Sequence, residues 1–192
     1  MADTKTDCIV LAAGHSRRFG AAKLMHTMPD GRALIEHTIA IYQAVFDVVH
    51  VVARDDDLEL QALLNRVGAM PIINTRAEQG MSQSIVAGIR SSDAQCGILI
   101  ALGDMPYVDV DTVRKIAAEL HADNIVMPRC QGRIGNPVAF GVAYFDELLR
   151  LNGDAGARAL INQNLANVTS VEVSDKGIFK DIDTPQDLLS RT

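Results

Sequence analysis

The sequence predicts an α/β protein in which helices cover both faces of a mostly parallel sheet. Of the 192 residues, 48% are hydrophobic but only 4% are aromatic, and there is no Trp. We therefore expect an aliphatic core, as in strands that are buried on both faces. Short apolar runs alternate with segments of helical periodicity, and this βαβα order favours parallel strands. The chain length fits one core, so residues 1–192 are expected to form a single domain.

The apolar runs predict five strands in the first two thirds of the chain, at residues 8–13, 47–53, 70–74, 97–102 and 124–128. The segments between them predict helices at residues 33–44, 57–67, 82–90 and 110–120. After Pro128 the alternation gives way to the loop-like segments GNPVAFG and NGDAGAR, a helix near 144–151 and a strand at 168–173. A last helix is predicted to begin at Thr184, because Pro185 suits the first helical position and Asp187 completes a variant of the capping box.

The segment LAAGHSRRFGAAKL, residues 11–24, is the first candidate for ligand binding. A predicted buried strand opens there into a loop that contains Gly14, Gly20, Arg17 and Arg18 and leads to Lys23. Glycines let the backbone approach a polyphosphate, while backbone amides and cations bind its oxygens. Neither GxxxxGK[ST] nor GxGxxG fits this loop. We interpret it as a triphosphate cradle, with an ordinary strand-to-helix turn as the alternative.

Two acidic segments are candidates for a metal site. Asp104, in ALGDMP, comes just past a predicted buried strand, where ligands of open α/β sheets collect. In DIDTPQDL, Asp181 and Asp183 share one face if Ile182 points into the core. We predict that Asp104 and Asp183 bind a divalent ion, with Asp181 as the alternative to Asp183. Turn and helix-capping roles are the structural alternatives for these aspartates.

These segments, in this order, resemble the signature of the MobA-like NTP transferase family, and within it the molybdenum cofactor cytidylyltransferases. The similarity also includes QGMSQSI at 79–85, GNPVAF and GDAGAR, and so extends over nearly the whole chain. The resemblance implies a three-layer α/β/α Rossmann-like nucleotidyltransferase fold. It also implies a magnesium-dependent enzyme that transfers CMP from CTP to the terminal phosphate of molybdenum-bearing molybdopterin and releases pyrophosphate.

The resemblance also assigns site residues. The family's catalytic arginine, lysine and metal-binding aspartate fall on Arg18, Lys23 and Asp104, and the second acidic position falls on Asp183. The residues implied to bind the nucleotide are Leu11, Ala12, Ala13, Gly14, Ser16, Arg17, Arg18, Lys23, Gly80, Ser82 and Ser84. Capping of the following helix is the alternative role for the two serines.

The expected base of the NTP and the expected acceptor molecule are inferred from individual residues. Ala13 matches the cytidylyl relatives, whereas guanylyl relatives tend to carry glycine there. GNPVAF and GDAGAR are rich in glycine and polar residues unsuited to a core, so Asn136, Asp154 and Arg158 are expected on the acceptor side. Relatives commonly have His at the position of Asn136 and usually have Met at the position of Phe19. Both differences bear on which acceptor the protein uses.

Three alternatives remain at this stage: guanylyl transfer to the same cofactor, nucleotidyl transfer to a sugar or polyol phosphate, and non-catalytic delivery of the cofactor to a recipient molybdoenzyme. Sugar-phosphate relatives usually place Pro before the loop lysine, where this chain has Ala22. The four residues Arg18, Lys23, Asp104 and Asp183 favour catalysis over a purely binding role.

Charge and hydropathy exclude other classes of partner. The net charge of −6 opposes binding to a phosphate backbone. The first residues do not resemble a secretory signal, and no apolar run approaches the roughly 20 residues that span a bilayer. We therefore expect a cytoplasmic protein with neither nucleic acid nor membrane as partner.

Overall fold

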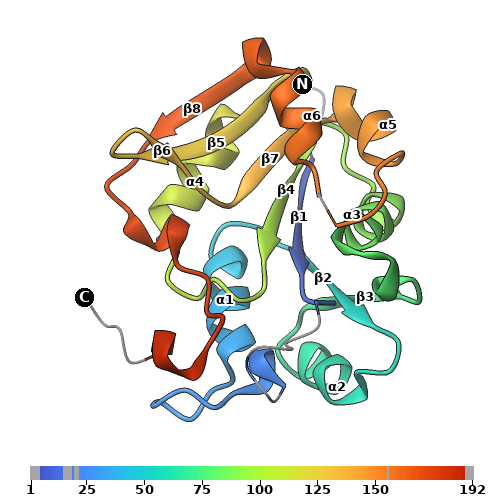
Figure 1. Cartoon of the computed structure of the whole chain (residues 1–192), viewed down its shortest axis with the longest axis vertical. Coiled ribbons are helices and arrows are strands. Elements are labelled where there is room, and N and C mark those ends of the chain that lie inside the picture. Colours follow the sequence, from blue (N-terminus) through green and yellow to red (C-terminus); the bar gives the residue numbers. More distant parts are fainter. Residues whose placement is uncertain (1–4, 15–18, 20–21, 155, 189–192) are drawn as a thin grey trace.

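A single sheet forms the centre of the molecule (Figure 1). The computed structural model describes residues 5–14, 19, 22–154 and 156–188. The strands are β1 Thr6–Leu11, β2 Val49–Arg54, β3 Met70–Asn74, β4 Gly97–Leu102, β5 Ile125–Cys130, β6 Arg133–Ile134, β7 Val138–Gly141 and β8 Val168–Glu172. The α-helices are α1 Leu34–Gln43, α2 Leu58–Arg66, α3 Met81–Ser91, α4 Val110–Glu119, α5 Phe145–Leu148 and α6 Arg158–Gln163. Short 3₁₀ helices are η1 Lys23–Met25, η2 Ala77–Gln79, η3 Val142–Tyr144, η4 Leu165–Asn167, η5 Lys176–Phe179 and η6 Pro185–Leu188.

The strand order is β3-β2-β1-β4-β7-β5-β6, with β8 paired to β5. The first four strands are parallel, as the βαβα pattern predicts. The sheet is nevertheless mixed, because β7 pairs antiparallel with both β4 and β5. The prediction that GNPVAF as a whole is unsuited to a core is therefore wrong. Its Val138, Ala139 and Phe140 are buried in β7, at the middle of the sheet.

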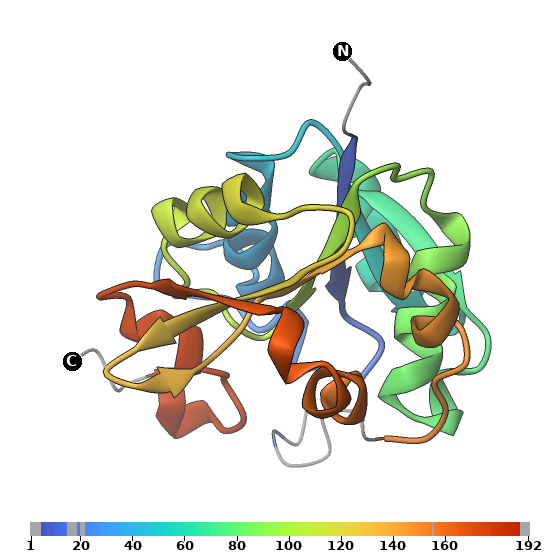
Figure 2. The ribbon, with the colours of Figure 1, turned by 90° about the horizontal axis from the view of Figure 1, so that it is seen from above.

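Helices cover the two faces of the sheet as separate layers, which Figure 2 shows edge-on. One core cluster joins α1, α2 and α4 to the face of β1 that carries Cys8 and Val10. The other joins α3, α5 and α6 to the opposite face, which carries Ile9. Alternate side chains of a strand point to opposite faces, so the apolar run of Cys8, Ile9 and Val10 in β1 is buried on both sides. The predicted three-layer α/β/α architecture is thus confirmed.

The carboxyl-terminal segment packs beside the loop that follows β4. Ile182 is buried against Leu34 and Met28, and its backbone N–H donates to the Asp104 carbonyl at 2.9 Å. The predicted bond of the capping-box variant forms, since the Asp187 carboxylate accepts from the Thr184 N–H at 2.7 Å. The predicted helix begins here, and within the described residues it is the 3₁₀ helix η6. This segment therefore carries Asp183 to the end of β4.

Asp175 fixes the approach of this segment, and we predict a large loss of stability on its removal. Its buried carboxylate accepts from the backbone N–H groups of Asp109 and Gly177 and from the Thr112 hydroxyl, at 2.7–2.9 Å. Asp175→Ala would leave three donors without their acceptor, which should cost about 2 to 4 kcal/mol of unfolding free energy. Denaturant unfolding measures this cost. Asp123→Ala, at an exposed turn, is the control, and equal stability of the two variants would contradict the prediction.

Candidate functional site

The candidate site lies at the carboxyl ends of β1 and β4. The Gly103 N–H donates to the Leu11 carbonyl at 2.9 Å, which holds the two strand ends together. A β-carbon at Gly103 would come within 3.0 Å of that carbonyl, so glycine permits this close approach. The Thr38 hydroxyl of α1 then donates to the Gly103 carbonyl at 2.9 Å. Asp104 follows directly and is thereby fixed to the rigid part of the fold.

Lys23 joins the two predicted metal ligands. Its Nζ atom lies 2.7 Å from Asp104 Oδ2 and 3.3 Å from Asp183 Oδ1. The lysine side chain is only 11% exposed, compared with 23% for Asp104 and 42% for Asp183. Three residues from distant parts of the sequence thus meet in one ion-pair cluster at the carboxyl ends of β1 and β4.

A cavity of about 690 Å³ opens over this cluster. This volume lies within the range of small-ligand pockets. The described lining residues are Leu11, Ala12, Ala13, Gly14, Lys23, Leu24, Ala77, Glu78, Gly80, Met81, Ser84, Leu102, Asp104, Asp154, Asp181 and Asp183. Among them, five carboxylates accompany a single lysine. A phosphate-bearing ligand at this part of the lining would therefore need additional positive charge.

Most of the predicted nucleotide-binding residues line this cavity, but a central part of the loop is not described. Ser16, Arg17 and Arg18 lie outside the described residues, as does Gly20. Ser82 is described but does not line the cavity. The lining residues Glu78 and Met81 were not singled out from the sequence. Their position beside Gly80, where a helix begins after the carboxyl end of β3, was the available signal.

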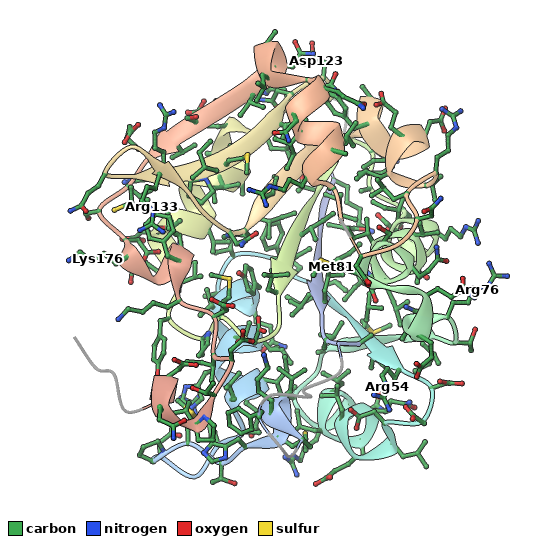
Figure 3. All side chains as sticks on the ribbon, in the orientation of Figure 1. Arg54, Arg76, Met81, Asp123, Arg133 and Lys176 are labelled. Carbon is green, nitrogen blue, oxygen red and sulfur yellow. The ribbon has the colours of Figure 1, made fainter. Side chains whose placement is uncertain are left out.

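The start of α3 forms one wall of the cavity, and Figure 3 labels Met81 there. Gly80 has φ +102°, and a β-carbon on it would lie 2.6 Å from the Gly153 carbonyl carbon. The Ser82 N–H donates to the Gly153 carbonyl at 3.1 Å. These contacts hold the Gly153 loop against the helix start, and so place Asp154 in the wall of the cavity.

Ser82 and Ser84 have different surroundings, although both are buried. Ser84 lines the cavity, and its hydroxyl accepts from the Asn74 amide at 3.1 Å. The Ser82 hydroxyl has no hydrogen-bond partner within the described part of the chain. The predicted alternative of helix capping is wrong, because the cap position is Gly80 and no side chain makes a capping bond.

The other two predicted acceptor residues lie outside the cavity lining. The backbone N–H of Asn136 donates to the Ile178 carbonyl at 3.0 Å, so this half-buried residue joins the loop before β7 to η5. Arg158 is exposed at the start of α6. Of the predicted acceptor residues, only Asp154 thus shares a cavity with Lys23 and Asp104.

The carboxylates fit a divalent ion that takes its remaining ligands from a substrate. Within the described residues, no group of three or more His, Cys, Asp or Glu side chains is placed to hold a metal. Mg²⁺ typically binds through one or two carboxylates together with water and substrate phosphates.

Hydrogen bonds to Asp187, first from the Thr184 N–H, lower the pKa of that carboxyl and keep the turn after Asp183 in place.

Comparisons with known proteins find a matching family model and several relatives. The family model of the MobA-like NTP transferase domain matches residues 8–168. The purine catabolism protein PucB of Bacillus subtilis is 29% identical, with 93% of this chain and 92% of that protein covered. The molybdenum cofactor cytidylyltransferase of Escherichia coli is 28% identical, with 96% and 94% covered.

Two further similarities extend over nearly the whole chain. The nicotine blue oxidoreductase of Paenarthrobacter nicotinovorans is 27% identical, with 98% of each chain covered. The structure of Rv0371C from Mycobacterium tuberculosis in complex with manganese matches with a TM-score of 0.80 at 27% identity, covering 98% of this chain and all of that one.

In the described part of this chain, no helix is long and apolar enough to cross a membrane.

Proposed function

The chain belongs to the MobA-like NTP transferase family, and on that premise we propose that it transfers CMP from CTP to the terminal phosphate of a molybdenum-bearing molybdopterin and releases pyrophosphate. The observation that carries the proposal is the cluster of Lys23, Asp104 and Asp183 at the end of β4, under a cavity of nucleotide size. The similarity to a molybdenum cofactor cytidylyltransferase over nearly the whole chain supports the choice of substrates.

The acidic lining supports a role for magnesium. The carboxylates of Asp104 and Asp183 are hard oxygen ligands. The Lys23 ammonium group contacts both of them, so a single cation can reach both. A bound Mg²⁺ would neutralise phosphate oxygens and favour attack on the α-phosphorus. Lys23 adds positive charge where pyrophosphate leaves, and Arg18 of the same loop is proposed to do likewise. An acceptor phosphate is already ionised at neutral pH, so the reaction can proceed without a general base.

The nucleotide and the acceptor are proposed to bind at adjoining walls of the cavity. Leu11, Ala12, Ala13 and Gly14 would lie along the nucleotide, and the methyl group of Ala13 would narrow the pocket against a purine. Asp154 reaches the same cavity from the Gly153 loop, so it would contact the acceptor close to the point of transfer. Asn136 and Arg158 would act from outside this lining. Delivery of the product to a molybdoenzyme is compatible with this role.

Pyrophosphate release tests the proposal. The protein is assayed with Mg²⁺ and each of CTP, GTP, ATP and UTP, with and without molybdenum-bearing molybdopterin. Release with CTP that requires the cofactor is the expected result. Equal release with GTP would refute the role of Ala13, and release only with a sugar or polyol phosphate would assign a different acceptor. Cofactor binding without release from any NTP would instead favour a delivery protein.

The two serines of α3 give a test of the nucleotide wall. Ser84→Ala should raise the KM for CTP about fivefold to tenfold, because it removes a hydroxyl that lines the cavity. Ser82→Ala is the matched control two positions away, and it should leave the KM nearly unchanged because Ser82 is outside the lining. Steady-state kinetics at saturating acceptor measures both values. A larger effect of Ser82→Ala would place the ribose or base elsewhere.

A further inference from the structure

The position of Lys23 is unusual for a residue expected to bind phosphate. Its ammonium group contacts both aspartates assigned to the metal, at 2.7 Å from Asp104 and 3.3 Å from Asp183. Lysine presents a compact point charge on a flexible stem, so its ammonium can occupy the place of a cation and can also move away from it. The lysine is mostly buried, whereas both aspartates remain partly open to the cavity.

Lys23 and a divalent ion would compete for the same two carboxylates. Two cations a few ångströms apart repel one another, and this repulsion is strong in a partly buried site. Each carboxylate that turns to a metal also loses part of its interaction with the ammonium group. Lys23 must therefore leave its position, or share it at a high energetic cost, when a metal ion is bound.

We propose that Lys23 is an internal substitute for the metal ion: it occupies the cation position between Asp104 and Asp183 until nucleotide binds, and then moves to the phosphates. The proposal rests on the metal site of the proposed function. A triphosphate supplies negative charge that Lys23 can bind on leaving the aspartates. The acidic cavity is thereby kept partly neutral without a ligand, and metal binding is coupled to nucleotide binding by the movement of one side chain.

The consequence is that Lys23 weakens metal binding to the free protein. Mn²⁺ binding without nucleotide is measured by the electron paramagnetic resonance signal of free Mn²⁺, for the wild type and for Lys23→Met. The neutral variant, which keeps an unbranched apolar side chain, should bind Mn²⁺ about tenfold more tightly than the wild type. It should also gain more thermal stability from Mn²⁺. A second neutral variant, Lys23→Gln, should do the same and serves if the methionine variant folds poorly.

Two controls restrict the effect to this site. Lys176→Met makes the same change of charge at an exposed lysine outside the cavity lining, at the edge of the molecule in Figure 3, and should leave Mn²⁺ binding unchanged. Adding Asp104→Asn to Lys23→Met should abolish the gain. Equal or weaker Mn²⁺ binding by both neutral Lys23 variants, or undetectable binding by both at millimolar Mn²⁺, would overturn the proposal.

The experiment is independent of the transferred group, because it uses the metal alone. If the neutral variants gain affinity but CTP with molybdenum-bearing molybdopterin yields no pyrophosphate, CMP transfer is refuted and the competition between Lys23 and the metal stands. If CTP yields pyrophosphate but the neutral variants gain nothing, the exchange is refuted and CMP transfer stands.

Discussion

Replacing Asp104 by asparagine should lower the kcat of pyrophosphate release by about a thousandfold. The change removes one negative charge from the proposed metal site and keeps the shape of the side chain. Asp104 is 23% exposed and contacts Lys23, which can still bind Asp183 in the variant. The fold should therefore persist, and the loss should be confined to catalysis. Stopped-time assays at saturating CTP and Mg²⁺ measure the effect, while thermal unfolding reports the stability.

Asp109→Asn is the matched control for this prediction. Asp109 lies in the same loop after β4, is exposed, and makes no capping bond with its side chain. Its replacement should leave kcat within about twofold of the wild type. An Asp104→Asn enzyme that is folded and nearly as active as the Asp109→Asn enzyme would show that Asp104 does not hold the metal.

The amino-terminal part of the fold was predictable because its signals are local. The runs predicted at 70–74 and 97–102 coincide with β3 and β4, and the helix boundaries differ by one residue at each end at most. The insertion of β7 between β4 and β5 was not predictable in the same way. Only four residues long, β7 follows two glycine-containing turns, and its burial comes from pairing with strands that lie far away in the sequence. Periodicity carries no information about such pairing.

The candidate site shows the same division. The placement of Asp104 just past a predicted strand brought the first acidic position within reach of sequence reasoning. Asp183 was predicted from the alternation in DIDTPQDL and from the family resemblance. The different positions of Ser82 and Ser84 could also have been predicted, since residues two apart on a helix point roughly 200° away from each other. The approach of the Gly153 loop to α3 could not, because it depends on a tertiary contact between Gly80 and Gly153. That contact is what places Asp154 beside the start of α3.

Gly80→Ala tests this contact, and we expect it to have the largest effect of any single methyl group in the cavity wall. The added β-carbon would overlap Asp154 Oδ1 and lie 2.6 Å from the Gly153 backbone, at a residue with φ +102°. Gly80 also has ψ 172°, a combination that is essentially restricted to glycine, so backbone strain and steric overlap together should cost about 2 to 4 kcal/mol of unfolding free energy. The Gly153 loop must also move away from α3, so affinity for CTP should fall about tenfold or more.

Gly68→Ala is the control for a positive φ without steric overlap. Gly68 also has a positive φ, +72°, but a β-carbon there would meet no atom within 4 Å. This variant should therefore lose only the strain component, about 1 to 2 kcal/mol, and should bind CTP like the wild type. Denaturant unfolding and calorimetric titration with CTP give both quantities for the two variants. If Gly80→Ala were no less stable than Gly68→Ala and bound CTP equally well, the Gly153 loop would not be held against α3, and Asp154 would lose its assigned place at the acceptor.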